Sequence, residues 1–176
     1  MPKRIRKLAP ADLKDAALHY LGRYAASTTR LRQVITRRIA RSAKANEFDP
    51  QPLLEELERV IAMLTRTGLL NDASFAEGRA RSLNRRGGSR RQIAAKLAAA
   101  GVARATTADA LAGVEAELPD AEFAAALAYA KRRRLGVFRT KRDETPERRR
   151  KDLMAMARAG FALDLARRAL AGADEP

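Results

Sequence analysis

The sequence contains no cysteine, no tryptophan and a single histidine, His19. Without cysteine the chain has no disulfide, no thiolate nucleophile and no sulfur ligand for zinc. One histidine cannot form a two-histidine metal pair, and we interpret His19 as a surface or boundary residue of a helix rather than a catalytic base. The sequence therefore predicts no metal site, no cofactor and no catalytic residues.

Long hydrophobic runs are also missing. No charge-free stretch approaches the ~18 apolar residues that a membrane helix needs. The basic start, residues 1–7, is followed by a segment that Pro10 and Asp12 interrupt, so it lacks the apolar core of a signal peptide. We expect a cytoplasmic protein that has no membrane partner.

Glycine, proline and aromatic residues are scarce, with 10 Gly, 7 Pro and 5% aromatics. Alanine, leucine, arginine, lysine and glutamate dominate instead, and this composition favours helices over a β-sandwich or a parallel sheet. Because 38 of the hydrophobic residues are alanine, the cores should be thin. The composition predicts an all-α fold.

Positive charge is abundant and comes in blocks. The chain has 36 Lys+Arg against 21 Asp+Glu, a net charge of +15. Residues 23–44 and 79–96 each carry seven basic residues and no acid, and residues 131–151 carry eleven against three acids. The acids lie between these blocks. Such a surplus indicates an anionic partner, and the two common candidates are nucleic acid and an anionic membrane surface.

The block spacing suggests internal repeats. Residues 99–113 align with residues 158–172 at an offset of 59, and seven of the fifteen positions are identical, among them Gly101 and Gly160. Apolar periodicity then predicts nine helices, arranged as an elongated array of three tandem three-helix repeats. We place a basic arm at 1–12, the repeats at 13–69, 70–118 and 119–172, and a short tail at 173–176.

Capping residues mark where these helices begin. We predict Ser27, Asp72 and Ser89 as N-caps, and a linker over residues 45–52. Leu97 lies on the core-facing side of the helix that follows Ser89. The predicted apolar face of the helix after Ser27 consists of Leu31, Val34, Ile35 and Ile39.

Four motifs span residues 13–172 in a fixed order. They are Tyr20-Leu21-Gly22-Arg23 with Ser27 and Leu31; Gly68-Leu69-Leu70-Asn71-Asp72 with Phe75-Ala76; the Arg85–Ser89 turn with Ile93, Leu97 and Gly101-Val102; and Arg158-Ala159-Gly160-Phe161. With these motifs the chain resembles the RecX family, regulators of the bacterial RecA recombinase. Two positions depart from the family pattern: Asn71 replaces an acid, and Arg30 replaces Glu or Gln.

The resemblance implies a protein that lies along the groove of the RecA–DNA filament and restrains ATP hydrolysis, strand exchange and co-protease activity. It implies no catalysis, and the sequence has no GxxxxGK[ST] phosphate loop. The charge leaves open an alternative, a stand-alone nucleic-acid-binding protein of helix-turn-helix or nucleoid-associated type. Because the charge spreads over three repeats and no heptad seam is present, we expect a monomer that binds single- and double-stranded DNA without sequence preference.

The arginines around the Gly87-Gly88 turn are the strongest candidate contacts. Arg85, Arg86, Arg90 and Arg91 flank this turn, and Ser89 with the free amides of the next helix is expected to meet a phosphate that the guanidiniums grip. The alternative is that these arginines are the solvated face of two helices. The other candidate contacts are Arg37, Arg38, Lys131, Arg132, Arg133 and Arg134.

Several other residues receive structural interpretations. Phe75, Phe123 and Phe161 are expected to anchor cores, while Tyr129, beside a basic run, is a candidate for stacking or interface contact. The basic residues near the start, Lys3, Arg4, Arg6 and Lys7, are expected to form a disordered arm.

Overall fold

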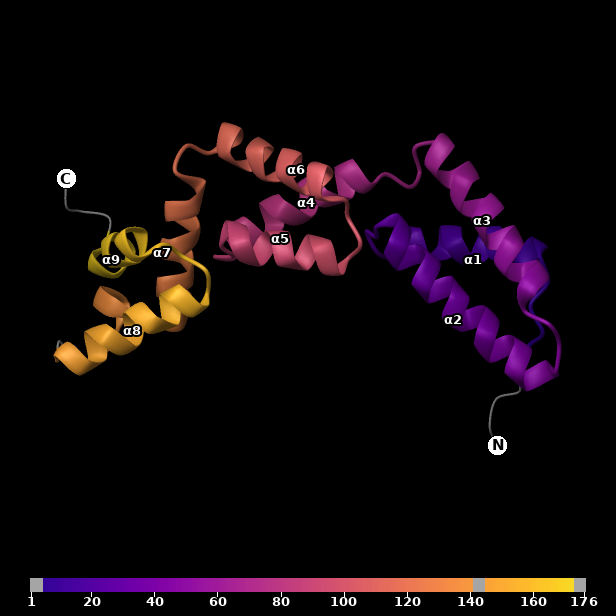
Figure 1. The fold of residues 1–176 in the computed structure, drawn as a ribbon, viewed down its shortest axis with the longest axis horizontal. Helices are drawn as coiled ribbons and strands as arrows, with labels where there is room; N and C mark the ends of the chain where they lie inside the picture. Colours follow the sequence, from indigo (N-terminus) through magenta and orange to yellow (C-terminus); the bar gives the residue numbers. More distant parts are fainter. Residues whose placement is uncertain (1–4, 141–144, 173–176) are drawn as a thin grey trace. The chain divides into compact units, whose positions relative to one another are not determined.

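The computed structural model describes residues 5–140 and 145–172. Over these residues the chain forms nine α-helices, one 3-10 helix and no strand (Figure 1). The elements are α1 (Ala11–Leu21), α2 (Thr28–Asn46), α3 (Gln51–Arg66), α4 (Asp72–Arg85), α5 (Arg90–Ala99), α6 (Arg104–Glu117), α7 (Ala121–Arg133), η1 (Gly136–Phe138), α8 (Pro146–Arg158) and α9 (Leu163–Ala171). The predicted all-α fold is confirmed. Lys3, Arg4 and the predicted tail at 173–176 lie outside the described residues.

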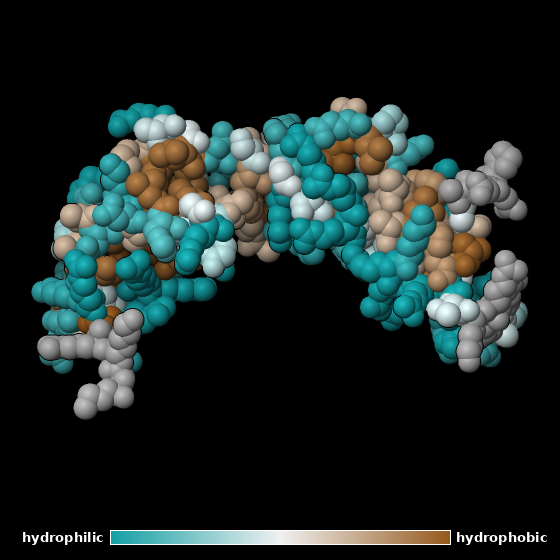
Figure 2. Space-filling model, turned by 180° about the vertical axis from the view of Figure 1, so that it is seen from behind, coloured by the Kyte–Doolittle hydropathy of each residue, from teal (hydrophilic) through white to brown (hydrophobic). Residues whose placement is uncertain are grey.

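The helices group into two compact units. The first comprises residues 1–75 together with 100–102, and the second comprises residues 76–99 and 103–176. The division into three repeats at the boundaries given above, and their elongated arrangement, stay predictions. Figure 2 shows one face of the molecule, which is mainly hydrophilic and carries several hydrophobic patches.

The core of the first unit lies between α1, α2 and α3. Leu31, Ile35 and Ile39 are almost fully buried, whereas Val34, predicted on the same face, is only half-buried. They pack with leucines of α1 and α3 in one cluster. The fully or nearly fully buried leucines from α1 and α3 are Leu13, Leu53, Leu57 and Leu64.

The linker between α2 and α3 is shorter than predicted. Helix α2 continues through Asn46, and α3 begins at Gln51, so the predicted linker over 45–52 is wrong at both ends. The Asn46 side-chain amide donates to the carbonyls of Ile5, at 3.2 Å, and Ser42, at 2.9 Å. These bonds hold the last turn of α2 against the segment that precedes α1.

That preceding segment is not the disordered arm that the sequence predicted. The buried Ser42 hydroxyl donates to the Arg6 carbonyl at 3.1 Å and accepts from the Leu8 amide at 3.0 Å. Leu8 is 8% exposed, and the Lys7 ammonium lies 5.3 Å from the centre of the Phe48 ring. Within the described residues the arm therefore packs on the first unit, because one buried serine satisfies two of its backbone groups.

The core of the second unit includes a cluster built largely from alanine. Five buried alanines of α7 and α9 surround Met156 and Phe161. Small side chains let the chain approach closely: a Cβ on Gly136, whose φ is +56°, would lie 2.3 Å from the Leu170 carbonyl oxygen. The buried Asp152 carboxylate accepts from the Gly136 amide at 2.9 Å and pairs with Arg139 at 2.5 Å. The core is thin, as predicted, and Phe161 anchors it.

Two serines cap helices in the same way in the two units. Ser27 accepts from the Arg30 amide at 3.1 Å at the start of α2, and Ser89 accepts from the Gln92 amide at 3.2 Å at the start of α5. Both predicted caps are confirmed. Each serine also donates its hydroxyl proton to a carbonyl far along the chain, Ser27 to Ala100 and Ser89 to Ala159.

The acceptors of those two bonds are the residues that the repeat alignment pairs. Ala100 and Ala159 each precede a glycine with positive φ, Gly101 at +77° and Gly160 at +91°. A Cβ on Gly101 would lie 2.3 Å from the Thr29 hydroxyl oxygen, and one on Gly160 would lie 2.7 Å from the Ser89 hydroxyl oxygen. A serine-capped helix start therefore meets a glycine-terminated helix end twice in this chain.

Asp72 does not cap its own helix. The Asn71 side chain accepts from the amides of Ala73 and Ser74, at 2.9 and 3.0 Å, and so caps α4. Asp72 is the first residue of α4, and its carboxylate accepts from the Thr28 amide at 2.7 Å, at the start of α2. The predicted cap was wrong by one residue, because Asp72 serves a helix 44 positions earlier.

Leu97 tests whether the inner faces were assigned correctly. Leu97 is 0% exposed, and replacing it with alanine is expected to reduce the free energy of unfolding by about 2–5 kcal/mol through lost burial and a residual cavity. Leu163→Ala, at a position 49% exposed, should change it by less than about 0.5 kcal/mol. Chemical denaturation followed by circular dichroism measures both; equal effects would contradict the assignment.

Gly160 tests the close approach between helix ends. Gly160→Ala is expected to cost about 1–2 kcal/mol from positive φ alone, and more from the contact with Ser89. Gly113, within α6, is the matched control, because a Cβ there meets nothing within 4 Å. Gly113→Ala should raise stability by up to about 1 kcal/mol through helix propensity. Thermal midpoints that rise for both variants would show that the Gly160 contact is absent.

Candidate nucleic-acid interface

The turn between α4 and α5 lies directly against α7. Gly87 has a φ of +78°, and a Cβ there would lie 2.5 Å from the backbone nitrogen of Tyr129. No other residue type fits at such a distance from a neighbouring backbone. Glycine at this position therefore brings the end of α4 and the end of α7 together.

This approach unites cations from two basic blocks. The Arg132 guanidinium donates to the carbonyl oxygen of Arg86, 46 positions earlier in the chain, and lies 5.6 Å from the centre of the Tyr129 ring. The Arg86 guanidinium donates to the Ser82 hydroxyl at 2.6 Å. Arg85, Arg86 and Arg132 are all exposed. We call these three residues the turn cluster.

The remaining cations of the 131–134 run are exposed at the end of α7. Positive side chains are favoured at a helix C-terminus, because its carbonyls carry partial negative charge. Arg134 ends the helix with a φ of 53°, and Lys131 lies 5.5 Å from the centre of the Phe138 ring. The cations therefore have a structural reason to lie there as well as being available to an anion.

Tyr129 holds the cluster against the core rather than standing free. Its ring is half-buried and lies 5.7 Å from the ring of Phe161, centre to centre, while Arg132 lies near it. Stacking of a guanidinium on an aromatic ring restrains that side chain without consuming its charge. The predicted role of Tyr129 in base stacking stays a prediction.

The phosphate cradle predicted at Ser89 is wrong, because the Ser89 hydroxyl and the amides of Arg90 and Gln92 are already bonded within the chain. Ser89 is fully buried, and its hydroxyl donates to the Ala159 carbonyl at 2.6 Å. The Arg90 amide donates to the Glu122 carboxylate at 2.9 Å, and the Gln92 amide bonds Ser89. A carboxylate of α7 thus takes the place that the sequence assigned to a phosphate.

Glu122 is the residue at this site that the sequence did not reveal. Burial raises the pKa of the Glu122 carboxyl, while the hydrogen bond from the Arg90 amide and the nearby Arg90 charge favour the ionised form. Its partner lies 32 positions away, so no local pattern marks it.

The two arginines after the turn differ from the two before it. The Arg90 guanidinium lies 3.6 Å from the Glu115 carboxylate, and both side chains are about half exposed. Arg91 is exposed, but its Cβ packs against Gly160. A Cβ added to Gly160 would lie 3.1 Å from the Arg91 Cβ. Of the four arginines predicted around the turn, only Arg90 has a carboxylate partner among the described residues, whereas Arg85, Arg86 and Arg91 have none.

Arg37 and Arg38 lie on α2 in the first unit, both exposed. Their basic block is partly neutralised, because Arg32 makes two hydrogen bonds to Glu58, at 2.7 and 2.9 Å. These bonds lower the pKa of the Glu58 carboxyl and raise the pKa of Arg32. In the second unit, Arg81 pairs in the same way with Glu117 at 2.7 Å.

Residues 5–140 and 145–172 contain neither a cluster of metal ligands nor a membrane-spanning helix. No group of three or more His, Asp or Glu residues there is placed to hold a metal ion. None of the helices in this part of the chain has the length and apolar character needed to cross a membrane.

Comparison with known proteins places this architecture in a family. A family model described as RecX, second three-helix domain, matches residues 71–111. Regulatory protein RecX of Myxococcus xanthus is 41% identical over 169 residues, which cover 96% of this chain and 89% of that protein. Regulatory protein RecX of Agrobacterium fabrum is 31% identical, covering 90% of this chain and 81% of that protein.

Solved structures agree on the fold. The crystal structure of RecX from Lactobacillus salivarius matches with a TM-score of 0.66 at 18% identity, covering 92% of this chain and 94% of that one. A second crystal structure, of a regulatory protein RecX, matches with a TM-score of 0.61 at 17% identity, covering 90% and 70%. At these identities the likeness concerns the fold alone, while the sequence identity to the two curated proteins decides the family. The chain belongs to the RecX family of regulatory proteins.

Proposed function

We propose that this RecX-family protein binds the RecA recombinase–DNA filament and lowers its ATPase, strand-exchange and co-protease activities. Family membership supports a regulatory role. The observation that carries the proposal is the turn cluster, in which the Arg132 guanidinium bonds the Arg86 carbonyl, so that exposed arginines of two separate basic blocks lie near one another. The protein acts by binding alone, so no covalent step is involved.

The turn cluster suits phosphate groups. Guanidiniums present several donors in a fixed plane and match phosphate oxygens in pairs. Phosphate contacts position a protein on nucleic acid without reading its sequence. The cluster therefore supports binding to single- and double-stranded DNA without sequence preference, within the filament.

A stand-alone nucleic-acid-binding protein is the second candidate function. The same exposed cations favour it, because phosphate contacts supply most non-specific affinity without any protein partner. The two functions differ in what determines the inhibition of the recombinase. A filament regulator inhibits at concentrations that leave bare DNA unbound, whereas a DNA competitor inhibits only when it covers the DNA.

The ATPase rate of the cognate RecA recombinase on single-stranded DNA distinguishes them. We expect inhibition well below one regulator per recombinase subunit, at concentrations where a gel shift detects little binding to DNA alone. The titration is run at two salt concentrations, since phosphate contacts weaken steeply with salt. Inhibition that appears only when DNA is saturated, and that vanishes together with DNA binding at high salt, would favour the second candidate.

A triple variant of the turn cluster tests the site. Replacing Arg85, Arg86 and Arg132 with alanine is expected to weaken filament binding and to reduce the slope of log K against log salt on single-stranded DNA by about 2, at about 0.7 for each phosphate contact. The same substitutions at three separate exposed arginines, Arg66, Arg104 and Arg167, remove equal charge and should change the slope less.

The two arginines beyond the turn provide a further comparison. Because Arg90 already pairs with Glu115, a variant in which Arg90 and Arg91 are both alanine should lose less affinity than the triple variant. Circular dichroism and the thermal midpoint establish that each variant is folded. If a folded triple variant binds like the unchanged protein, the cluster is not the contact.

A further inference from the structure

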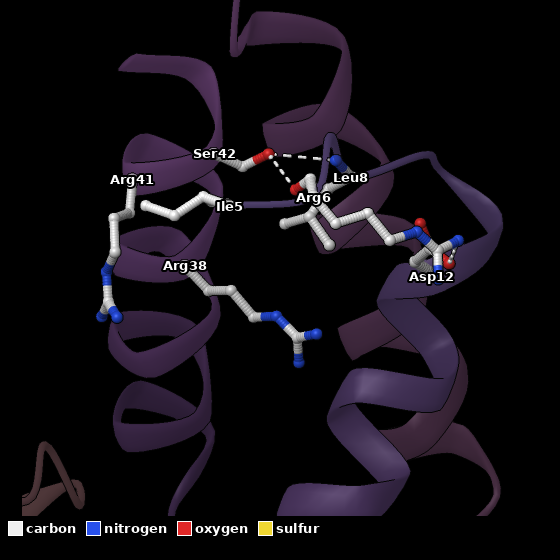
Figure 3. Close-up of a pocket in the computed structure, with 7 residues that line it drawn as sticks. All are labelled: Ile5, Arg6, Leu8, Asp12, Arg38, Arg41 and Ser42. Atoms are coloured by element: carbon white, nitrogen blue, oxygen red, sulfur yellow. Dashed lines mark hydrogen bonds and ion pairs between the residues drawn. The ribbon is translucent and has the colours of Figure 1, made fainter. Parts of the chain in front are cut away.

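A small pocket lies in the first unit, where the segment before α1 crosses α2. Its volume is about 270 Å³. Figure 3 shows its lining, which comes from that segment, from α2 and from the start of α1. The lining residues are Ile5, Arg6, Leu8, Asp12, Arg38, Arg41 and Ser42.

The wall of this pocket is fixed by hydrogen bonds. The Ser42 hydroxyl joins α2 to the backbone of Arg6 and Leu8. On the other side, the Asp12 carboxylate accepts from the Arg6 guanidinium at 3.0 Å and from the Ala9 amide at 2.8 Å. The pocket is therefore a formed feature of the unit.

Of the three arginines that line the pocket, only Arg6 forms an ion pair among the described residues. Arg38 and Arg41 both come from α2, but Figure 3 shows the Arg41 guanidinium at the other edge of that helix, pointing away from the Arg38 guanidinium. In residues 5–140 and 145–172, neither makes an ion pair with a carboxylate. Asp12, the carboxylate in the lining, is already bonded by Arg6. Figure 3 shows Arg38 extending from α2 toward α1. The pocket thus attracts an anion.

The rest of the lining is apolar. Leu8 is buried at 8% exposure, and Ile5 leaves 43% of its surface open to solvent. An apolar wall beside free guanidiniums is typical of protein interfaces, in which arginine and apolar anchors are enriched and charges such as Lys and Glu are depleted. The volume is also below the roughly 300 Å³ at which pockets for small-molecule ligands begin.

We propose that this pocket binds an acidic side chain of a protein partner, with an apolar residue beside it in the partner's sequence. The carboxylate pairs with Arg38, whose planar guanidinium forms two parallel hydrogen bonds with it. The apolar neighbour packs on Ile5. A nucleic-acid strand fits less well, because the Asp12 carboxylate in the lining repels phosphate and because the sugar–phosphate backbone has no apolar group to place on Ile5.

The identity of the partner rests on the proposed function, which makes it a subunit of the recombinase filament. The chemistry of the pocket does not depend on that identity. Its test therefore uses neither recombinase nor filament, so that failure of one proposal leaves the other standing.

The probe is a short fluorescein-labelled peptide that alternates glutamate with leucine, and its binding to the full chain is followed by fluorescence anisotropy. A second peptide with glutamine in place of glutamate is the neutral control. Arg38→Ala is expected to weaken binding of the acidic peptide by about tenfold, the loss of one charge-assisted hydrogen bond. Arg37→Ala is the matched control, since Arg37 is an exposed neighbour on α2 outside the pocket.

Ile5→Gln separates a peptide pocket from a general anion site. This variant leaves the charge unchanged, and we expect it to weaken the peptide several-fold while leaving binding of a short single-stranded DNA as it was. The proposal is overturned if the acidic peptide does not bind, if the glutamine peptide binds equally well, or if Arg37→Ala matches Arg38→Ala. It is also overturned if Ile5→Gln affects the DNA and spares the peptide.

Discussion

One contact recurs in this chain and determines where its helix ends lie: the hydroxyl of a serine N-cap donates to the last carbonyl of a distant helix. Ser27 reaches Ala100 and Ser89 reaches Ala159, and in both cases the next residue is a glycine with positive φ. A buried hydroxyl that both accepts and donates satisfies one helix start and one helix end at once. Since a Cβ on either glycine would clash with the serine-capped helix, the contact also requires glycine there. The turn before α5, which carries the exposed Arg86, directly precedes Ser89 and this bond.

The large positive charge is distributed unevenly once the chain is folded. Arg32, Arg81 and Arg139 each find a carboxylate on another helix, so that part of each basic block is neutralised within its own unit. The two exposed pairs, those of Arg32 and Arg81, contribute little to stability. In the described part of the chain, the cations that keep no carboxylate partner include the turn cluster, the end of α7, and Arg38 and Arg41 on α2.

Local sequence patterns correctly predicted the features that depend on neighbouring residues. The caps Ser27 and Ser89, the buried face that contains Leu31 and the core role of Phe161 all followed from spacing within one helix or turn. What failed depends on partners far along the chain. Asp72, Glu122 and Ser42 bond backbone amides 44, 32 and 34 positions away, and nothing in their immediate sequence indicates it. The predicted phosphate cradle failed for this reason, because Glu122 already occupies the helix start that a phosphate was expected to meet.

The two candidate surfaces present the same guanidinium chemistry in different settings. In the turn cluster, exposed arginines at helix ends have water on most sides, so that contact with phosphates releases counterions and weakens with salt. In the pocket of the first unit, Arg38 and Arg41 lie beside Ile5 and Leu8, where burial of apolar surface adds a contribution that salt does not screen. A partner made of nucleic acid alone has no apolar side chain to bury in the pocket of the first unit. A partner made of protein alone has no phosphates for the turn cluster to bind. A filament in which protein subunits coat DNA offers both kinds of ligand, and the presence of both settings on one small chain favours such a composite partner.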